Sequence, residues 1–279
     1  MYALLAPAPH LRPYIECYWS VNITLPDSQP LNEHIFVDGK ADLIFNYGDA
    51  YFREHMHDET RLQQASTNLD AQRNYPVAIR QAGAIQLVGV RFFAGALSQF
   101  TSTSLFAISN HVLEPDDLFP RDCVRQLEEQ LFDSFAHIGK QVELLNAFFT
   151  HQLERHHEQT FVDAAARLVR TCGGQIDMSS LADEFGYSLR HINRYFNKQF
   201  GFTAKYYARL VRFQGMQVAL MSDTALVDVA MAAGFYDQSH FVRECQTFTG
   251  MNPQAYRTYL QDNQARVPPN LVHLVQENG

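Results

Sequence analysis

Two stretches in the last third of the chain decide the fold of that region: residues 181–196, LADEFGYSLRHINRYF, and residues 229–243, VAMAAGFYDQSHFVR. Each reads as a short apolar helix, a turn of glycine and an aromatic residue, and a second helix that begins with polar residues. The glycines, Gly186 and Gly234, can adopt positive φ, which ends one helix and lets the next cross it steeply. A helix-turn-helix of this kind places its second helix in a DNA major groove. The repeated pattern therefore predicts a unit that reaches two successive segments of groove.

The first unit carries polar side chains suited to reading bases. Ser188 is placed to cap its second helix, and Ser180 with Asp183 favours a capping box at the start of its first helix. Arginine can donate two hydrogen bonds to guanine, and asparagine can bridge the polar atoms of adenine. A solvated helix face carries the same residue types, so this unit alone leaves both interpretations open. The residues expected on the open side are Arg190, Asn193, Arg194 and Asn197.

The second unit favours DNA reading, because its polar residues fall at the same distances from the turn. Asp237 is placed as the helix cap, and Phe241 and Phe248 are expected on the buried side. The outward residues are Gln238, Ser239, Val242 and Arg243. Phosphate contacts that set the register on the duplex are predicted for Asn197, Lys198, Lys205, Arg209, Arg212 and His240. A single helix from residue 204 to residue 220 is expected to join the two units, and Pro253 is expected to open a final helix.

The stretch from Gly234 to Arg257 resembles the signature of the AraC/XylS family of bacterial transcriptional regulators. The family pattern is close to GF-x-D-x-S-H-F-x-R-x-F…G-x-x-P-x-x-Y-R, and residues 234–243 (GFYDQSHFVR) and 250–257 (GMNPQAYR) follow it. The resemblance covers roughly residues 161–260. It implies a seven-helix DNA-binding domain whose two recognition helices enter adjacent major-groove segments. Matched by position, it implies base reading by Arg190, Asn193 and Arg194 in the first helix and by Gln238, Ser239, Val242 and Arg243 in the second, with His240 at the edge.

One departure from the family pattern bears on affinity. Where the family has Phe followed by basic residues, this chain has Cys245, Gln246 and Thr247. The change removes a basic pair that would contact phosphate and leaves a smaller core side chain. We therefore predict that the first recognition helix supplies most of the specificity.

The N-terminal half reads as β-structure followed by helices. Strands are expected at residues 15–23, 43–47 and 85–93, which are rich in β-branched and aromatic residues. The long polar stretch 53–74 is expected to be a loop, and a helix at 142–153 is expected to pack within its own domain or against a second subunit. The segments around LRPYIECYW, VDG and GVRF also resemble an uncharacterised domain that commonly precedes this DNA-binding module. Family habit implies a sensor or dimerisation role.

An aromatic cluster in that half could line a pocket for a small apolar effector or could simply be core. Its members are Tyr18, Trp19, Phe45, Tyr47 and Phe92.

Charge is divided unevenly along the chain, whose net charge is −8. Residues 1–159 hold 11 Lys and Arg against 20 Asp and Glu, whereas residues 160–260 hold 10 against 8. Only the second part suits contact with phosphate. The four cysteines are scattered, which fits a reduced cytoplasm, and no apolar run is long enough to cross a bilayer.

The histidines and cysteines of the chain raise two enzyme interpretations. His55, His57, Asp58 and Glu59, with His34 upstream, could imitate a cupin-type metal site, although a charged loop would look the same. A DNA-alkyl transferase would need a zinc-bound reactive cysteine, and the chain has no Cys cluster to hold zinc.

The sequence thus predicts an α+β protein of two domains and a tail. Residues 1–155 form a small antiparallel, barrel-like β domain with helices, acting in sensing or dimerisation. Residues 156–260 form an all-α DNA-binding domain, and residues 261–279 a tail. The predicted function is a cytoplasmic, sequence-specific transcriptional regulator that responds to a small molecule and is not an enzyme. The alternative is a cupin-like metal-dependent enzyme or metal sensor with an appended DNA module. Expected partners are double-stranded DNA, an effector, RNA polymerase and a second copy of the chain, with no cofactor, metal or membrane.

Overall fold

The first half of the chain forms two antiparallel sheets that face each other. The computed structural model describes residues 2–26, 28–56, 60–156 and 160–262. One sheet has the strand order β1-β2-β9-β4-β7-β10, and the other has the order β3-β8-β5-β6. The strands are β1 (Tyr2–Leu5), β2 (Ile15–Leu25), β3 (Leu31–Ile35), β4 (Ala41–Asn46), β5 (Tyr51–His55), β6 (Arg61–Gln64), β7 (Asn68–Asp70), β8 (Val77–Gln81), β9 (Gly83–Phe92) and β10 (Val112–Leu113).

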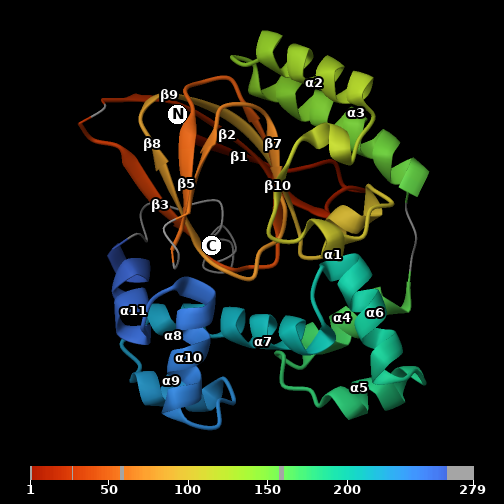
Figure 1. Ribbon diagram of the computed structural model, residues 1–279, viewed down its shortest axis with the longest axis vertical. Coiled ribbons are helices and arrows are strands. Elements are labelled where there is room, and N and C mark those ends of the chain that lie inside the picture. The colour runs from red at the N-terminus through yellow and green to blue at the C-terminus, as the bar shows by residue number, and fades with distance from the viewer. Residues whose placement is uncertain (1, 27, 57–59, 157–159, 263–279) are drawn as a thin grey trace.

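Helices cover the outer face of the larger sheet and make up the second half of the chain (Figure 1). Single 3-10 turns lie at Ala96–Gln99 and Pro115–Asp117. The helices are α1 (Leu105–Ile108), α2 (Arg121–Asp133), α3 (Ile138–His156), α4 (Phe161–Thr171), α5 (Met178–Phe185), α6 (Leu189–Phe200), α7 (Ala204–Gly215), α8 (Gln217–Met221), α9 (Leu226–Ala232), α10 (Gln238–Thr249) and α11 (Pro253–Asp262). No helix among the described residues is both long and apolar enough to cross a membrane.

The larger sheet buries a different set of side chains on each face, because successive residues of a strand point in opposite directions. Tyr18, Phe45 and Phe92 are fully buried in the cluster that includes residues of α2 and α3. Leu145 and Phe149 of α3 belong to the same cluster, so this helix packs within its own half of the chain.

Trp19 lies on the opposite face and packs over Gly89, where any Cβ would collide with the indole ring. Tyr47 packs beneath α2 and α3, and its hydroxyl donates to the carbonyl oxygen of Glu128 at 3.0 Å. The five aromatic residues predicted to line an effector pocket therefore do not surround one space. Four lie beneath α2 and α3, and Trp19 lies on the other side of the sheet.

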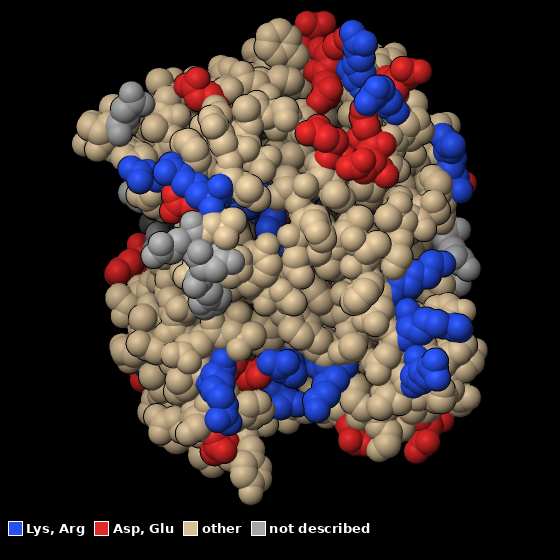
Figure 2. All heavy atoms as spheres, in the orientation of Figure 1, with Lys and Arg blue, Asp and Glu red and all other residues tan. Residues whose placement is uncertain are grey.

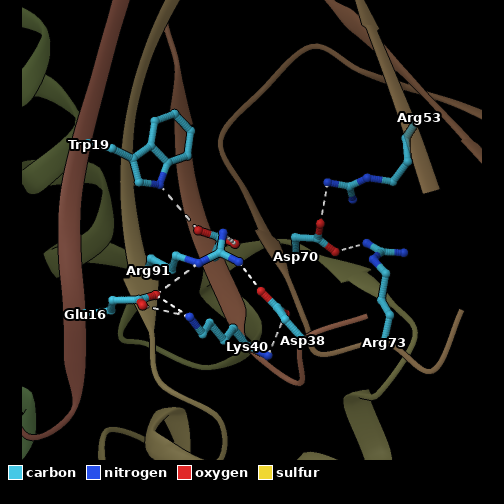
Figure 3. A network of polar contacts seen from close by, with 9 residues as sticks. Glu16, Trp19, Asp38, Lys40, Arg53, Asp70, Arg73 and Arg91 are labelled. Carbon is cyan, nitrogen blue, oxygen red and sulfur yellow. Dashed lines mark hydrogen bonds and ion pairs between the residues drawn. The ribbon is translucent and has the colours of Figure 1, made fainter. Parts of the chain in front are cut away.

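The polar stretch 53–74, expected to be a loop, includes the end of β5 and the whole of β6 and β7. Arg53 of β5 reaches across to Asp70 of β7, with Nη2 2.6 Å from Oδ2, and Arg73 pairs with the other carboxylate oxygen. All three side chains are buried (Figure 3). The expectation of a loop was wrong because these charges pair inside the protein, where they join one sheet to the other, and do not face water.

A second buried network centres on Arg91 of β9 (Figure 3). Its guanidinium contacts Glu16 at 3.2 Å, Asp42 at 3.0 Å and also Asp38. Lys40 lies 2.7 Å from the Glu16 carboxylate. Burial alone would lower the pKa of Arg91. The effect of the neighbouring carboxylates is larger and holds the pKa of Arg91 above its ordinary value.

Glu33 of β3 supplies a pH-dependent contribution to stability. Burial raises the pKa of its carboxyl to about 7, with Asp42 adding to the shift and Arg91 opposing it. Between the ordinary pKa and pH 7 the folded protein binds the proton and the unfolded chain does not, so stability falls as pH rises through this window. Relative to the Glu33→Gln variant, we expect the wild type to lose on the order of 2 kcal/mol between pH 4 and pH 8. Urea unfolding of both proteins across this range measures the difference. A difference that does not change with pH would contradict the assignment.

The two halves share one buried cluster in addition to the clusters that each half encloses. Phe36 and Val37, between β3 and β4, belong to the buried cluster that contains Phe213, Phe248 and Tyr256 of the helical half. The Val37 N–H donates to the Phe248 carbonyl oxygen at 3.0 Å. The β half and the helical half are therefore docked against each other through specific contacts.

Candidate nucleic-acid interface

The first helix-turn-helix consists of α5 and α6. Gly186 adopts φ 66° between them, and the Ser188 hydroxyl accepts from the His191 N–H as the cap of α6. The cap of α5 differs from the prediction. It is Asp177, whose carboxylate accepts from the N–H groups of Ser179 and Ser180, so the helix begins before Ser180.

The second helix-turn-helix consists of α9 and α10. Gly234 adopts φ 72°, and the Asp237 carboxylate caps α10 by accepting from the His240 N–H at 2.6 Å. This turn is one residue longer than the first, so the polar residues of the two units match in distance from the helix cap and not, as expected, in distance from the turn glycine. The additional residue is Tyr236, whose side chain is 95% exposed next to the leading end of α10. Sequence reasoning did not select it, because an aromatic residue beside a turn is as readily part of a core.

The two recognition helices are equivalent in length and in position from their caps. Each has 12 residues, and each ends at a left-handed glycine, Gly201 or Gly250. Arg194 and Arg243 stand at the same offset from Ser188 and Asp237, and both are exposed. Of the other predicted base readers, Arg190, Gln238 and Ser239 are exposed, while Asn193 and Val242 are half-buried.

The arrangement of these helices suits a duplex that lies along one side of the protein. Figure 1 shows α7 running between the two units, with α6 near one of its ends and α10 near the other. The C-terminal ends of both recognition helices contact the β half through Gly201 and Gly250. Their capped N-terminal ends therefore lie away from the β half, where DNA can approach.

Asn193 has a structural contact that the sequence does not reveal. Its Oδ1 accepts from the Ala204 N–H at 3.1 Å and thereby ties α6 to the start of α7. Bridging an adenine requires both the oxygen and the nitrogen of the amide. While Oδ1 holds α7, the predicted bidentate contact with adenine is not available.

Arg209 and Arg212 connect the helices instead of facing outward. Arg209 donates to both Glu244 carboxylate oxygens, with Nη2 2.7 Å from Oε1, and so joins α7 to α10. Arg212 donates to the Gly174 carbonyl oxygen at 3.1 Å. The predicted phosphate contacts by these two arginines conflict with this geometry, because the guanidinium groups already have partners within the protein.

The remaining predicted phosphate contacts differ in exposure. Lys198 and Lys205 are exposed, and Asn197 is half-buried. His240 is half-buried and lies 3.6 Å from Glu244. Figure 2 shows basic side chains gathered over the helical half and acidic ones clustered over α2 and α3. Basic side chains also lie over parts of the β half in this view, but the acidic cluster over α2 and α3 has no counterpart of that size on the helical half.

The joining segment is not one helix. Helix α7 ends at Gly215, and the short helix α8 begins at Gln217. Tyr256 and Arg257 of α11 then support this break. The Tyr256 hydroxyl accepts from Gln217 Nε2 at 2.8 Å, and Arg257 donates to the Leu220 carbonyl oxygen at 3.0 Å. Pro253 opens α11 as predicted.

Cys245 is fully buried in the core of the second unit. Burial raises the pKa of its thiol to about 12, so it is neutral at physiological pH. It fills the position where the resemblance implies Phe and has a packing role.

The described residues contain no group of three His, Cys, Asp or Glu placed to hold a metal ion. His34 stacks on Tyr259, with ring centroids 5.2 Å apart, and His55 lies against Tyr75 at 4.0 Å. His55 is on β5 and not in a loop. His57, Asp58 and Glu59 lie outside the described residues.

Comparisons with known proteins match both halves of the chain. Residues 181–259 match the family described as a helix-turn-helix domain, and residues 4–114 match a domain of unknown function, DUF6597. The chain is 31% identical over 88 residues to the uncharacterized HTH-type transcriptional regulator YbfP of Bacillus subtilis (strain 168). The match spans 31% of this chain and 30% of that protein.

Solved structures with detectable similarity include ToxT of Vibrio cholerae O395, with 11% identity, a TM-score of 0.44, and coverage of 87% of this chain and 97% of that one. ToxT of V. cholerae strain SCE256 with a bound unsaturated fatty acid has 11% identity and a TM-score of 0.43 over 84% of this chain and 97% of that one. The AraC-like transcriptional activator CuxR has 14% identity and a TM-score of 0.27 over 77% of this chain and 85% of that one.

The two capped helix pairs agree with the sequence matches: residues 181–259 are similar to the helix-turn-helix domain family, and residues 4–114 are similar to a family of domains of unknown function.

Proposed function

We propose that the protein is a sequence-specific DNA-binding transcriptional regulator. Residues 156–260 read DNA, and residues 1–155 control that activity by sensing a small molecule or by dimerisation. The observation that carries the proposal is the equivalence of α6 and α10, which have the same length, the same type of cap and an exposed arginine at the same offset. A solvated surface has no reason to repeat these features at both ends of a shared helix.

The proposed base-reading set follows the geometry. Arg190 and Arg194 read one half of an asymmetric site, and Gln238, Ser239 and Arg243 read the other half about one helical turn away. Asn193 and Val242 stand at equivalent, half-buried positions behind these readers. Exposed Lys198 and Lys205 are proposed to hold the phosphate backbone.

Selection of binding sites from a library of random duplexes tests the proposal on the full-length chain. We expect enrichment of two conserved blocks whose centres are about 10 base pairs apart. The Arg190→Ala, Arg194→Ala double variant should lose the first block and keep the second. Equal affinity for selected and random duplexes, with no enriched motif, would exclude sequence-specific reading.

Several expectations stay predictions. They are control by a small-molecule effector, contact with RNA polymerase, formation of a homodimer, a cytoplasmic location and the absence of enzymatic activity. Residues 263–279 of the predicted tail lie outside the described residues.

A further inference from the structure

Both recognition helices end against the β half, and they do so at equivalent residues. Gly201 is the first residue after α6, and Gly250 is the first residue after α10. A Cβ at Gly201 would collide with side chains of Gln72 and Ser109, and a Cβ at Gly250 would lie 3.1 Å from Met56 and 3.4 Å from Pro76. The β half therefore contacts the internal repeat of the helical half at matching points.

The first docking point holds the end of α6. The Phe200 ring covers Gly95, where an added Cβ would lie 2.6 Å from ring carbons. Ser109 Oγ lies 3.3 Å from the Gly201 carbonyl oxygen, and Gln72 donates to Ser109 Oγ at 2.8 Å. Figure 1 shows α1, which precedes Ser109, directly above α6.

The second docking point holds the end of α10. The last four carbonyl groups of a helix have no hydrogen-bond donor within the helix. The carbonyl oxygen of Phe248 is one of these in α10, and it accepts from the Val37 N–H. The Phe36 ring inserts between the rings of Tyr256 and Tyr259, at centroid distances of 5.0 and 5.1 Å in edge contacts. The segment from Phe36 to Asp38 also holds α7, since Gln214 Nε2 donates to the Asp38 carbonyl oxygen at 3.0 Å.

The two docking points belong to one braced framework. Asp38, next to Phe36 and Val37, is held by Arg91, which also holds Asp42. Asp42 on β4 is the register partner of Asp70 on β7, and Gln72 of the first docking point follows β7 by two residues. Hydrogen-bonded strands and buried ion pairs thus connect the first docking point with the second.

We propose that the β half determines which spacing of half-sites the protein accepts, with Phe36 and Val37 as positioning residues that act through α10. The inference rests on the proposed function and adds to it. A single linker, α7, leaves each helix-turn-helix free to tilt about its packing on that linker. A second attachment of both units to one braced body removes this freedom and sets the distance and rotation between α6 and α10.

The test compares the spacing preference of the wild type with that of full-length variants. The probes are the duplex selected by the wild type and two versions with its centre lengthened or shortened by one base pair. Each change moves one half-site by about 3.4 Å and rotates it by about 34°. The readout is the ratio of Kd values for altered and selected duplexes, and misfolded protein cancels from this ratio because it lowers the active fraction equally for both.

We expect the wild type to bind the altered duplexes about 10- to 100-fold more weakly, as when the contacts of one recognition helix are lost. In Phe36→Ala this ratio of Kd values should fall by at least about fivefold, which corresponds to the free energy of one or two hydrogen bonds. Val37→Pro removes the N–H that bonds the Phe248 carbonyl oxygen, and it also fixes φ at residue 37 and restricts Phe36, so it should lower the ratio in the same direction. Phe119→Ala is the matched control, because it truncates a buried phenylalanine of the β half whose ring packs on Phe148 and Phe149 of α3.

The outcomes separate the two proposals. An unchanged ratio in both variants, with selected-site binding intact, would overturn the positioning role and leave the proposed function standing. A ratio that falls equally in Phe119→Ala would also overturn it, because general loosening would then suffice. If the wild type enriches no duplex in the selection, the proposed function itself fails.

Discussion

Replacing Arg91 with methionine is expected to lower the free energy of unfolding by about 3–5 kcal/mol, the cost of breaking a buried ion network on one side. The Arg91 side chain is 3% exposed and contacts Glu16, Asp38 and Asp42. Methionine fills much of the volume but leaves three carboxylates, with Lys40 as the remaining cation among the described residues of this network. Urea unfolding at pH 7 measures the loss.

The loss should shrink as pH falls toward 5. Without Arg91, burial and mutual repulsion raise the pKa values of the buried carboxylates, so in the folded variant they bind protons at a higher pH. Protonation removes the repulsion between them, and the difference in stability from the wild type decreases. Arg125→Met is the control, since the Arg125–Glu129 pair is 77% and 68% exposed and should contribute less than about 1 kcal/mol. Equal losses in the two variants at neutral pH would contradict the role given to the buried network.

Arg194→Ala is expected to weaken binding to the selected duplex by about 10- to 100-fold, and Arg243→Ala by less. Arg194 is held in place, with its guanidinium carbon 5.2 Å from the Tyr195 ring and Nη2 3.3 Å from His191 Nδ1. Lys198 provides a third cation on α6, after Arg190 and Arg194, whereas Thr247 stands at the equivalent position on α10 and donates to the Arg243 carbonyl oxygen. The first recognition helix thus presents the stronger contact surface.

Gel-shift titration of both variants against one duplex measures the ranking. Lys140→Ala, an exposed substitution on α3 far from the recognition helices, should leave Kd unchanged and controls for overall charge. A larger loss in Arg243→Ala than in Arg194→Ala would reverse the ranking and place most of the specificity in α10.

Local features of the helical half were predictable because their causes lie within a few residues. Ser188 and Asp237 cap the helices expected of them, and each accepts from an N–H three residues later. The turn glycines follow from the same short-range geometry. The break between α7 and α8 was missed, because the residues that support it, Tyr256 and Arg257, come from a distant helix.

Features that depend on contacts between distant segments could not be predicted. The pairing of Arg53 and Arg73 with Asp70 turned an expected loop into buried strands. The sequence predicts a phosphate contact for Arg209, but this side chain donates to Glu244, 35 residues away. The sequence does not show whether a charged side chain faces water or pairs with an opposite charge inside the protein. Its role is therefore known only once the fold is known.

Helix periodicity and turn chemistry act over short distances, so the amino-acid sequence is sufficient to predict the two helix-turn-helix units, most of their caps and the outward direction of Arg194 and Arg243. The folded chain was needed to show that Phe36 and Val37 enter the core of the second unit and that both recognition helices end against the β half. These contacts join residues about 90 or more positions apart, and their stability comes from burial and hydrogen bonds that exist only after both halves have folded.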